Sequence, residues 1–354
     1  MATITLHHRL HAVKAACLLA AAFACASSQA QGGAAQGAAA QDRAAPGAAA
    51  QGPAAQGSLR TAVVLSHDMA VEPNITYLRA SGQELKLDVY RPRRDDTARL
   101  PVVLNFHGGG WVAGNRESRT LTVLPYLQMG FAVINVQYRL ANVAPAPAAV
   151  EDTLCALQWV GRNAERYRFD LERVITTGDS AGAHLALATA MIPADSPFTN
   201  GCAFTEGSWS GPYKNAAPKV KAVVNWYGIT DVADMLQGPN IRSYAVGWFG
   251  SLPGRTALAR ELSPLSHVRA GGPAVFTIHG DADKLVPYAH GVRLKSALDK
   301  AGVGNVMHTV KGRWPRWLHP RAAGRHLRRN PVLPAPARHH SGVPLTLRFT
   351  ADFV

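Results

Sequence analysis

One serine lies in a pentapeptide that could make it a nucleophile. The sequence GDSAG, residues 178–182, places Ser180 between a β-branched apolar run, residues 174–177, and a helix-forming run, residues 183–191. A strand, a sharp turn and a helix in this order hold a serine hydroxyl where a substrate carbonyl can reach it. Glycine is needed on each side because a Cβ atom would clash in so tight a turn. The pattern predicts nucleophilic catalysis by Ser180.

A glycine-rich stretch could stabilise the oxyanion that such an attack creates. The sequence HGGGW, residues 107–111, follows the apolar residues 102–106. Fixed backbone N–H groups stabilise a tetrahedral oxyanion by about 3 kcal/mol each. We expect Gly109 and Gly110 to donate from this loop, and Ala181 from the turn after the nucleophile. The alternatives are a glycine-rich turn before a helix and a phosphate-binding loop, but the latter would end in Gly-Lys-Ser/Thr, and this chain continues into tryptophan.

The elements that would position both stretches alternate along the chain. Apolar strands are followed by amphipathic helices, with helical patterns at residues 148–163 and 288–301. This alternation predicts an α/β fold, with a mostly parallel central sheet covered by helices on both faces. Ligands of such sheets bind at the carboxyl ends of the strands, and Ser180 follows one such end. The predicted strands, the first two of them antiparallel, are residues 75–78, 85–90, 101–106, 133–138, 174–177, 221–226, 274–279 and 305–310.

Several motifs together resemble the α/β-hydrolase superfamily. HGGGW and GDSAG are accompanied by YRL at residues 138–140 and by the stretches 147–152 and 226–231. The sequence is similar to hormone-sensitive-lipase-like esterases and to secreted feruloyl- or acetyl-xylan-esterase-like serine esterases, from about residue 60 to residue 312. The resemblance implies the α/β-hydrolase fold, an acyl-enzyme mechanism and a Ser–acid–His triad in that chain order. It implies no cofactor and no metal.

The resemblance also implies which residue is the acid of the triad. HGDADKLVP, residues 279–287, is similar to the HGxxDxxVP loop of the family, in which Asp283 takes the place of the acid. A carboxylate there would orient the imidazole and stabilise its protonated form. Asp281 falls on a variable position of the loop. The alternative is that the two aspartates cap the following helix, which suits Asp281 better than Asp283.

The histidine that the resemblance implies does not stand in its expected setting. The family places it further along the chain, in a turn resembling GGGHGGF, whereas residues 311–320 read KGRWPRWLHP. His319 lies at a usable distance along the chain, but it stands between Leu318 and Pro320 without a neighbouring glycine. The other histidines considered for this role are expected to be structural or less suitable: His107, His184, His326, His339 and His340.

A change of reading frame would account for this break in the pattern. The codons CGG TGG CCA CGG TGG CTT CAC C encode residues 313–319 and open the next codon. Read one base later, they become GGT GGC CAC GGT GGC TTC ACC, which encodes GGHGGFT. Because tryptophan has one codon, Trp314 and Trp317 force glycine in the shifted frame. We predict a single-base insertion near codon 312 that replaced the natural C-terminus, and a diverged basic tail is the alternative.

The predicted domain organisation has four segments. Residues 1–30 are expected to be a signal peptide, with Arg9 and Lys14 before an apolar core and a small-x-small cleavage site at its end. That core is too short to span a bilayer, so no stable membrane insertion is expected, and the mature protein would be secreted or periplasmic. The other segments are an Ala/Gly/Gln-rich linker, a hydrolase domain and an Arg/Pro-rich tail, at residues 31–57, 58–312 and 313–354 respectively.

Charge and cysteine content narrow the possible partners. Of the net charge of +14, half comes from residues 313–354, which hold eight arginines and one acidic residue. The hydrolase domain is therefore not a basic nucleic-acid binder. No histidine or cysteine spacing typical of a metal site occurs. Cys155 and Cys202 could pair in an oxidising compartment, although Cys155 could equally be a buried free thiol in a helix.

The sequence thus predicts an exported serine hydrolase that cleaves carboxylic esters, acting on a small ester or an esterified carbohydrate. A peptidase- or formamidase-like hydrolase is a second interpretation, because amide chemistry uses the same triad. A third is a catalytically inactive hydrolase-like product that lacks the triad histidine. The residue pattern does not indicate an oligomeric state. The aromatic and apolar residues of stretches 194–214 and 235–252 suggest a roof over the substrate pocket, although packing in the interior explains them equally well.

Overall fold

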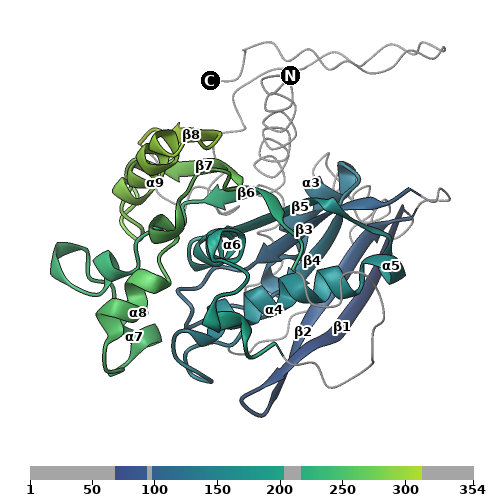
Figure 1. Cartoon of the computed structure of the whole chain (residues 1–354), viewed down its shortest axis with the longest axis horizontal. Coiled ribbons are helices and arrows are strands. Elements are labelled where there is room, and N and C mark those ends of the chain that lie inside the picture. The colour runs from purple at the N-terminus through teal and green to yellow at the C-terminus, as the bar shows by residue number, and fades with distance from the viewer. Residues whose placement is uncertain (1–67, 94–97, 203–216, 313–354) are drawn as a thin grey trace, which may run out of the picture.

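The computed structural model describes residues 68–93, 98–202 and 217–312, and within them one sheet dominates (Figure 1). The predicted signal peptide, linker and tail lie outside these residues, as does His319. Eight strands of the described chain are ordered β1-β2-β4-β3-β5-β6-β7-β8. The strands are β1 (Met69–Ala80), β2 (Gln83–Pro92), β3 (Leu100–Phe106), β4 (Ala132–Val136), β5 (Phe169–Asp179), β6 (Val220–Trp226), β7 (Ala274–Gly280) and β8 (Asn305–Val310).

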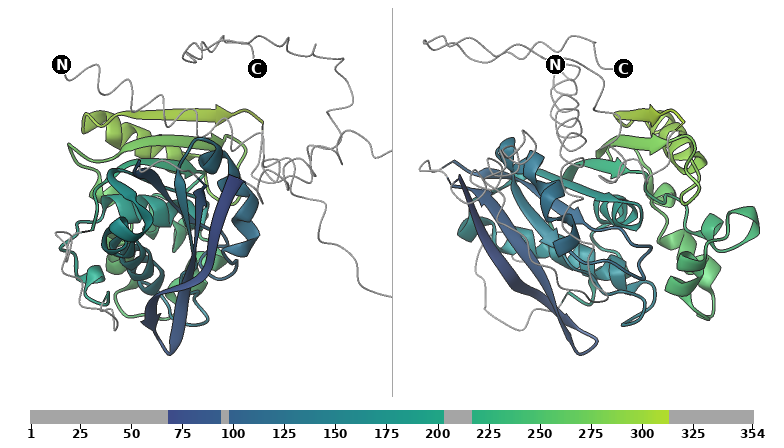
Figure 2. Two further views of the ribbon diagram at one scale, coloured as in Figure 1. Left: turned by 90° about the vertical axis from the view of Figure 1, so that its right-hand side faces the viewer. Right: turned by 180° about the vertical axis from the view of Figure 1, so that it is seen from behind.

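The sheet is mostly parallel, as the alternation of elements predicts. β1 pairs with β2, and β2 with β4, in the antiparallel sense, whereas the pairs from β4 through β3 to β8 are all parallel. The sheet twists, so the edge strands β1 and β8 run in clearly different directions (Figure 2). Because β3, β5, β6 and β7 are parallel, their carboxyl ends lie at the same edge of the sheet.

Strand β5 is longer than the apolar run 174–177 suggests. It begins at Phe169 and includes the exposed charged residues Glu172 and Arg173. These side chains form ion pairs at the surface, Glu172 with Lys221 at 2.8 Å and Arg173 with Asp170 at 2.5 Å. Hydrophobic periodicity misses such residues because their side chains are charged and exposed.

Helices cover both faces of the sheet. Leu104 of β3 packs in one cluster with Leu185 of α6 (Ala181–Met191), whereas its neighbour Val103 packs in a second cluster with Leu124 of α3 (Leu124–Gln128). Alternate residues of a strand point to opposite faces, so the two clusters lie on opposite sides of the sheet. Figure 1 shows α4 (Ala148–Arg162) and α6 next to each other on the side facing the viewer.

The remaining helices are short, apart from α9. They are α5 (Ala164–Tyr167), α7 (Ser243–Phe249), α8 (Arg255–Glu261), α9 (Ala289–Lys300) and the 3₁₀ helices η1 (Glu117–Val123), η2 (Pro197–Thr199), η3 (Ala233–Met235), η4 (Gly238–Asn240) and η5 (Pro264–His267). Within the described ranges, no helix has both the length and the apolar character needed to cross a membrane.

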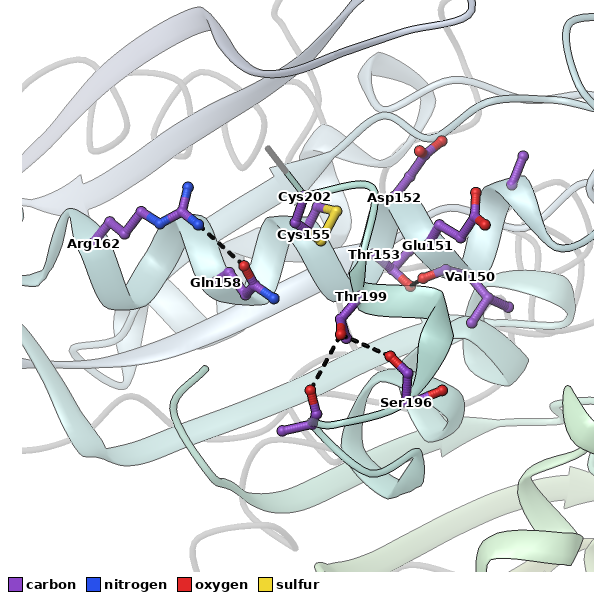
Figure 3. Close-up of a disulfide and its surroundings, with 12 residues drawn as sticks. Val150, Glu151, Asp152, Thr153, Cys155, Gln158, Arg162, Ser196, Thr199 and Cys202 are labelled. Atoms are coloured by element: carbon purple, nitrogen blue, oxygen red, sulfur yellow. Dashed lines mark hydrogen bonds between the residues drawn. A yellow bond between two sulfur atoms is a disulfide. The ribbon is translucent and has the colours of Figure 1, made fainter. Parts of the chain in front are cut away.

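A disulfide joins α4 to the segment that follows α6. Cys155 and Cys202 are bonded, with their Cα atoms 5.1 Å apart and a sequence separation of 47 (Figure 3). The sequence left open whether Cys155 forms a disulfide or is a buried free thiol; in the structure it forms the disulfide. The bond ties the segment after α6 to α4, in addition to the apolar packing of Phe198 against the core.

We expect loss of this disulfide to destabilise the domain. Closing a loop of 47 residues in the unfolded chain corresponds to about 4 kcal/mol of unfolding free energy in the chain-entropy treatment. Urea unfolding with and without dithiothreitol measures the difference. The Cys155→Ala/Cys202→Ala double variant should match the reduced protein and respond no further to reductant. Identical urea midpoints for the oxidised and reduced protein would contradict the expectation.

Candidate active site

Ser180 lies in a strained turn between β5 and α6. Its backbone has φ 53° and ψ −118°, a conformation that residues with a Cβ atom rarely adopt. The Ser180 N–H donates to the carbonyl oxygen of Trp226 at 2.9 Å, and the Ser180 carbonyl accepts from the His184 N–H at 3.0 Å. The turn is thus anchored to β6 on one side and to α6 on the other.

Two glycines allow this turn to pack directly on the end of β3. A Cβ atom on Gly178 would lie 2.5 Å from the Phe106 carbonyl oxygen, and one on Gly182 would lie 2.2 Å from the same atom. Both distances are far below van der Waals contact, and the obstructing atoms are backbone that cannot move aside. The glycines of GDSAG are therefore required by close packing, and they bring the serine turn against the start of the HGGGW loop.

The first peptide plane of the glycine loop is held by His107. The His107 ring is stacked on Tyr138, with 4.2 Å between centroids, and its Nδ1 lies 2.8 Å from the Gly108 carbonyl oxygen. Burial lowers the pKa of His107 to about 4, so the ring is neutral near pH 7 and Nδ1–H donates to Gly108. In a trans peptide the C=O and the following N–H point in opposite directions. The Gly109 N–H therefore points away from the imidazole.

The second peptide plane is held by the turn of the loop itself. The Gly109 carbonyl accepts from the N–H groups of Val112 and Ala113, at 3.1 and 3.0 Å. By the same trans geometry, the Gly110 N–H is directed to the opposite side. Within the described part of the chain, the N–H groups of Gly109 and Gly110 have no protein acceptor. The positive φ angles, 124° at Gly109 and 61° at Gly110, give the reason for glycine at both positions.

Asp283 lies in the loop after β7, and one of its two carboxylate oxygens has no hydrogen-bond partner among the described residues. Its Oδ1 accepts from the N–H groups of Leu285 and Val286, at 2.8 and 3.0 Å. Its side chain is fully buried, yet among the described residues Oδ2 has no hydrogen-bond partner. His279 Nε2 lies 3.4 Å from Oδ2 but is within 3.0 Å of the Val286 carbonyl. A buried carboxylate oxygen without a donor is costly, so Asp283 has strong capacity for one more hydrogen bond.

Asp281 is in a different environment. It is exposed, and its Oδ1 accepts from the Gly312 N–H at 2.7 Å. Neither aspartate caps α9, because Asp281 accepts from Gly312 and Asp283 from N–H groups that precede the helix. The two carboxylates of the loop thus differ in burial: Asp281 is exposed to water, and the Asp283 side chain is buried.

Tyr227 lies between the serine turn and the acid loop. It follows β6, has the unusual φ of 41°, and its N–H donates to the Ile278 carbonyl of β7 at 2.8 Å. Burial raises the pKa of its hydroxyl, and the charges of Asp179 and Asp283 raise it further. Its hydroxyl lies 3.5 Å from Asp179 Oδ2 at the end of β5, so Tyr227 contacts the ends of both β5 and β7. Sequence reasoning includes Tyr227 only as part of the family-like stretch 226–231 and assigns it no role in the site.

The segment around α7 bridges the glycine loop and the acid loop. The Tyr244 hydroxyl donates to the Leu285 carbonyl at 2.9 Å, and Arg242 Nε donates to the same oxygen at 3.2 Å. On its other side Tyr244 packs on Gly110, where an added Cβ atom would lie 2.7 Å from the Tyr244 Cβ. α7 falls within the predicted roof, stretch 235–252. Part of the other predicted roof stretch, 194–214, lies outside the described residues.

His184 is a structural residue of this region. Burial lowers its pKa to about 4, and its Nε2 donates to the Leu262 carbonyl at 2.9 Å. Its ring meets Trp111 edge-on, with 4.9 Å between centroids. In the described ranges no group of three or more His, Cys, Asp or Glu side chains could hold a metal ion.

The strand order and the serine turn together define an α/β hydrolase. A family model described as BD-FAE matches residues 87–298, which is more than half of the chain. This protein therefore belongs to the BD-FAE family. The match begins in β2 and ends in α9, so it includes both glycine stretches and the Asp283 loop.

Curated relatives and solved structures agree with this assignment. The chain is 27% identical to esterase LipQ of Mycobacterium tuberculosis, over 64% of this chain and 52% of that protein. It is 29% identical to the probable carboxylic ester hydrolase LipM of the same organism, over 62% and 50%. The chain thus spans about half the length of these relatives. A truncated carbohydrate esterase from gut microbiota is similar in structure, with a TM-score of 0.57, 28% identity, and 72% of this chain and 92% of that one covered.

Proposed function

We propose that this chain is an exported carboxylic ester hydrolase that forms an acyl-enzyme on Ser180. The observation that carries the proposal is the contact between the strained serine turn and the glycine loop, whose N–H groups at Gly109 and Gly110 have no protein acceptor in the described chain. The names of its relatives, an esterase and a probable carboxylic ester hydrolase, support the same reaction.

The proposed reaction uses the site as follows. Ser180 Oγ attacks the ester carbonyl while an imidazole takes its proton. The oxyanion accepts hydrogen bonds from Gly109, Gly110 and Ala181, the last being the first residue of α6, whose N–H has no acceptor within the helix. The protonated imidazole then gives its proton to the leaving alcohol. Water, activated by the same imidazole, releases the acid from Ser180.

We further propose that Asp283 orients this imidazole and that the histidine is the one encoded in the shifted frame after Gly312. The buried, unpartnered Oδ2 of Asp283 supports the first part, because an imidazole N–H is the donor that it would accept. The Gly312 N–H bound to Asp281 supports the second, because it places the start of the next segment beside the acid loop. In the shifted frame the histidine would be the third residue after Gly312.

The substrate that we propose is an esterified carbohydrate or another small ester. The solved carbohydrate esterase supports the first choice, since the match covers 92% of that chain at 28% identity. Export is supported by the disulfide between Cys155 and Cys202, because such bonds form and persist in oxidising compartments. It also agrees with the signal peptide predicted for residues 1–30.

The acid is tested by a matched pair of substitutions in the chain that carries the shifted-frame histidine. Asp283→Asn keeps an oxygen for the loop N–H groups but replaces the buried acceptor, so kcat for p-nitrophenyl acetate should fall by about 10⁴-fold. Asp281→Asn, in the same loop but exposed, keeps an oxygen that can accept from the Gly312 N–H and should leave kcat near its original value. Equal losses in the two variants would refute the assignment of Asp283, and steady-state kinetics with thermal melts as a folding check decides between the outcomes.

A further inference from the structure

The residue next to the nucleophile holds the glycine loop through its side chain. Asp179 Oδ1 accepts from the Gly108 N–H at 3.1 Å, across 71 residues of sequence. Its Oδ2 lies 2.5 Å from Nη2 of Arg119, which belongs to η1. The two side chains are only 18% and 21% exposed, so this is not a loose surface pair. One carboxylate thus binds a backbone N–H and a cation at the same time.

Two further contacts restrict how this carboxylate can rotate. A Cβ atom on Gly108 would lie 2.5 Å from Asp179 Oδ2, which shows how closely the loop rests on the carboxylate. The Tyr227 hydroxyl lies 3.5 Å from the same oxygen. With Arg119, Gly108 and Tyr227 around it, the carboxylate has one orientation in which Oδ1 meets the loop.

The orientation of the Asp179 carboxylate affects the predicted oxyanion donors through the backbone of the glycine loop. Asp179 holds the N–H of Gly108, and His107 holds the C=O of Gly108. With both ends of this residue fixed, the direction of the adjoining Gly109 N–H is determined. A shift of the carboxylate would release one of these two restraints and turn the donor away from the developing charge.

We propose that the Arg119–Asp179 ion pair is a positioning device for the oxyanion loop, in which Arg119 fixes the carboxylate and the carboxylate fixes Gly108. Both are positioning residues, since neither needs to contact the substrate. This inference rests on the proposed function of the site as an ester hydrolase. It assigns the aspartate of GDSAG a role that the pentapeptide alone does not reveal.

A rescue experiment on the full chain tests the proposal. In Asp179→Asn the new amide must offer its one oxygen to either Gly108 or Arg119, and the cation should win, so the loop is released. In Asp179→Asn/Arg119→Met no cation competes, and the amide oxygen is free to accept from Gly108. Hydrogen exchange of a peptide covering residues 107–114 should become faster in the single variant and return toward wild type in the double variant.

Kinetics supplies a readout that a purely structural role would not move. Because one misdirected oxyanion donor costs about 10²- to 10³-fold, kcat of Asp179→Asn, measured in the chain that carries the shifted-frame histidine, should fall by about 10²-fold with little change in KM. The double variant should regain most of this loss. Asp234→Asn is the matched control: it breaks the Asp234–Arg293 pair, 2.6 Å long and similarly half-buried, and should alter neither loop exchange nor kcat.

The outcomes separate the inference from the proposed function. Unchanged loop exchange in Asp179→Asn, or a double variant no better than the single one, would overturn the positioning role. If the loop responds as expected but no form of the chain hydrolyses any ester, the proposed function fails while the contact stands. Should Asp179→Asn not fold, Arg119→Met on its own gives the second test. It removes the restraint on Oδ2 while Oδ1 can still accept from Gly108, so loop exchange should rise only slightly above wild type, to about the level expected of the double variant, and unchanged exchange would count against the proposal.

Discussion

Deleting one nucleotide after codon 312, so that the chain continues from Gly312 as GGHGGFT, should raise the rate of ester hydrolysis by about 10⁴- to 10⁶-fold. This is the range of activity that is lost when a triad histidine is removed. The reason is that none of the histidines in the described residues is identified as a catalytic base for Ser180, whereas the shifted frame encodes a histidine three residues after Gly312. Gly312 itself is bound to Asp281 in the acid loop. Initial rates with p-nitrophenyl acetate, measured on both chains at equal concentration, give the ratio.

The control for this experiment is the same restored chain with its new histidine replaced by alanine, which should return to the activity of the original chain. Sequencing the gene gives a separate test, because codons incompatible with the shifted turn would remove the basis of the hypothesis. If the restored chain folds and is no more active than the original, the Arg/Pro-rich tail is a diverged terminus, and the catalytic base for Ser180 must be another residue.

The second large effect is expected for the nucleophile. Ser180→Ala in the restored chain should lower kcat by about 10⁶-fold, the cost of removing a catalytic serine that works as part of a triad. The strained backbone at φ 53° should tolerate alanine as well as serine, since both have a Cβ atom, so the loss would not come from unfolding. Steady-state kinetics and labelling by a fluorophosphonate probe measure the loss independently.

Ser118→Ala is the matched control, because Ser118 is exposed and its hydroxyl only donates to the Asn115 carbonyl within its own turn. It should retain full activity and full labelling. Hydrolysis that survives Ser180→Ala would show that another group carries the reaction, and the proposed acyl-enzyme would have to be abandoned.

Much of the fold could be predicted from the sequence because its signals are local. The helices expected at 148–163 and 288–301 appear as α4 and α9 within one residue at each end. The turn expected at 178–182 joins a strand to a helix, with a positive φ at Ser180. Apolar periodicity and turn chemistry act over a few residues, so they are legible in a single chain. The full extent of β5 could not be predicted, because Glu172 and Arg173 in its first half are charged and exposed.

By itself, the sequence determined the α/β class, the serine turn and the glycine loop, since each depends on neighbouring residues. Tertiary structure alone decided which contacts join them. It paired Cys155 with Cys202, buried Asp283 while leaving Asp281 in water, and brought Asp179 to Gly108. The physical reason is that strands distant in the chain become neighbours only when the sheet forms in its particular order. Burial and hydrogen-bond partners at its carboxyl edge follow from that order, and no short stretch of sequence specifies it.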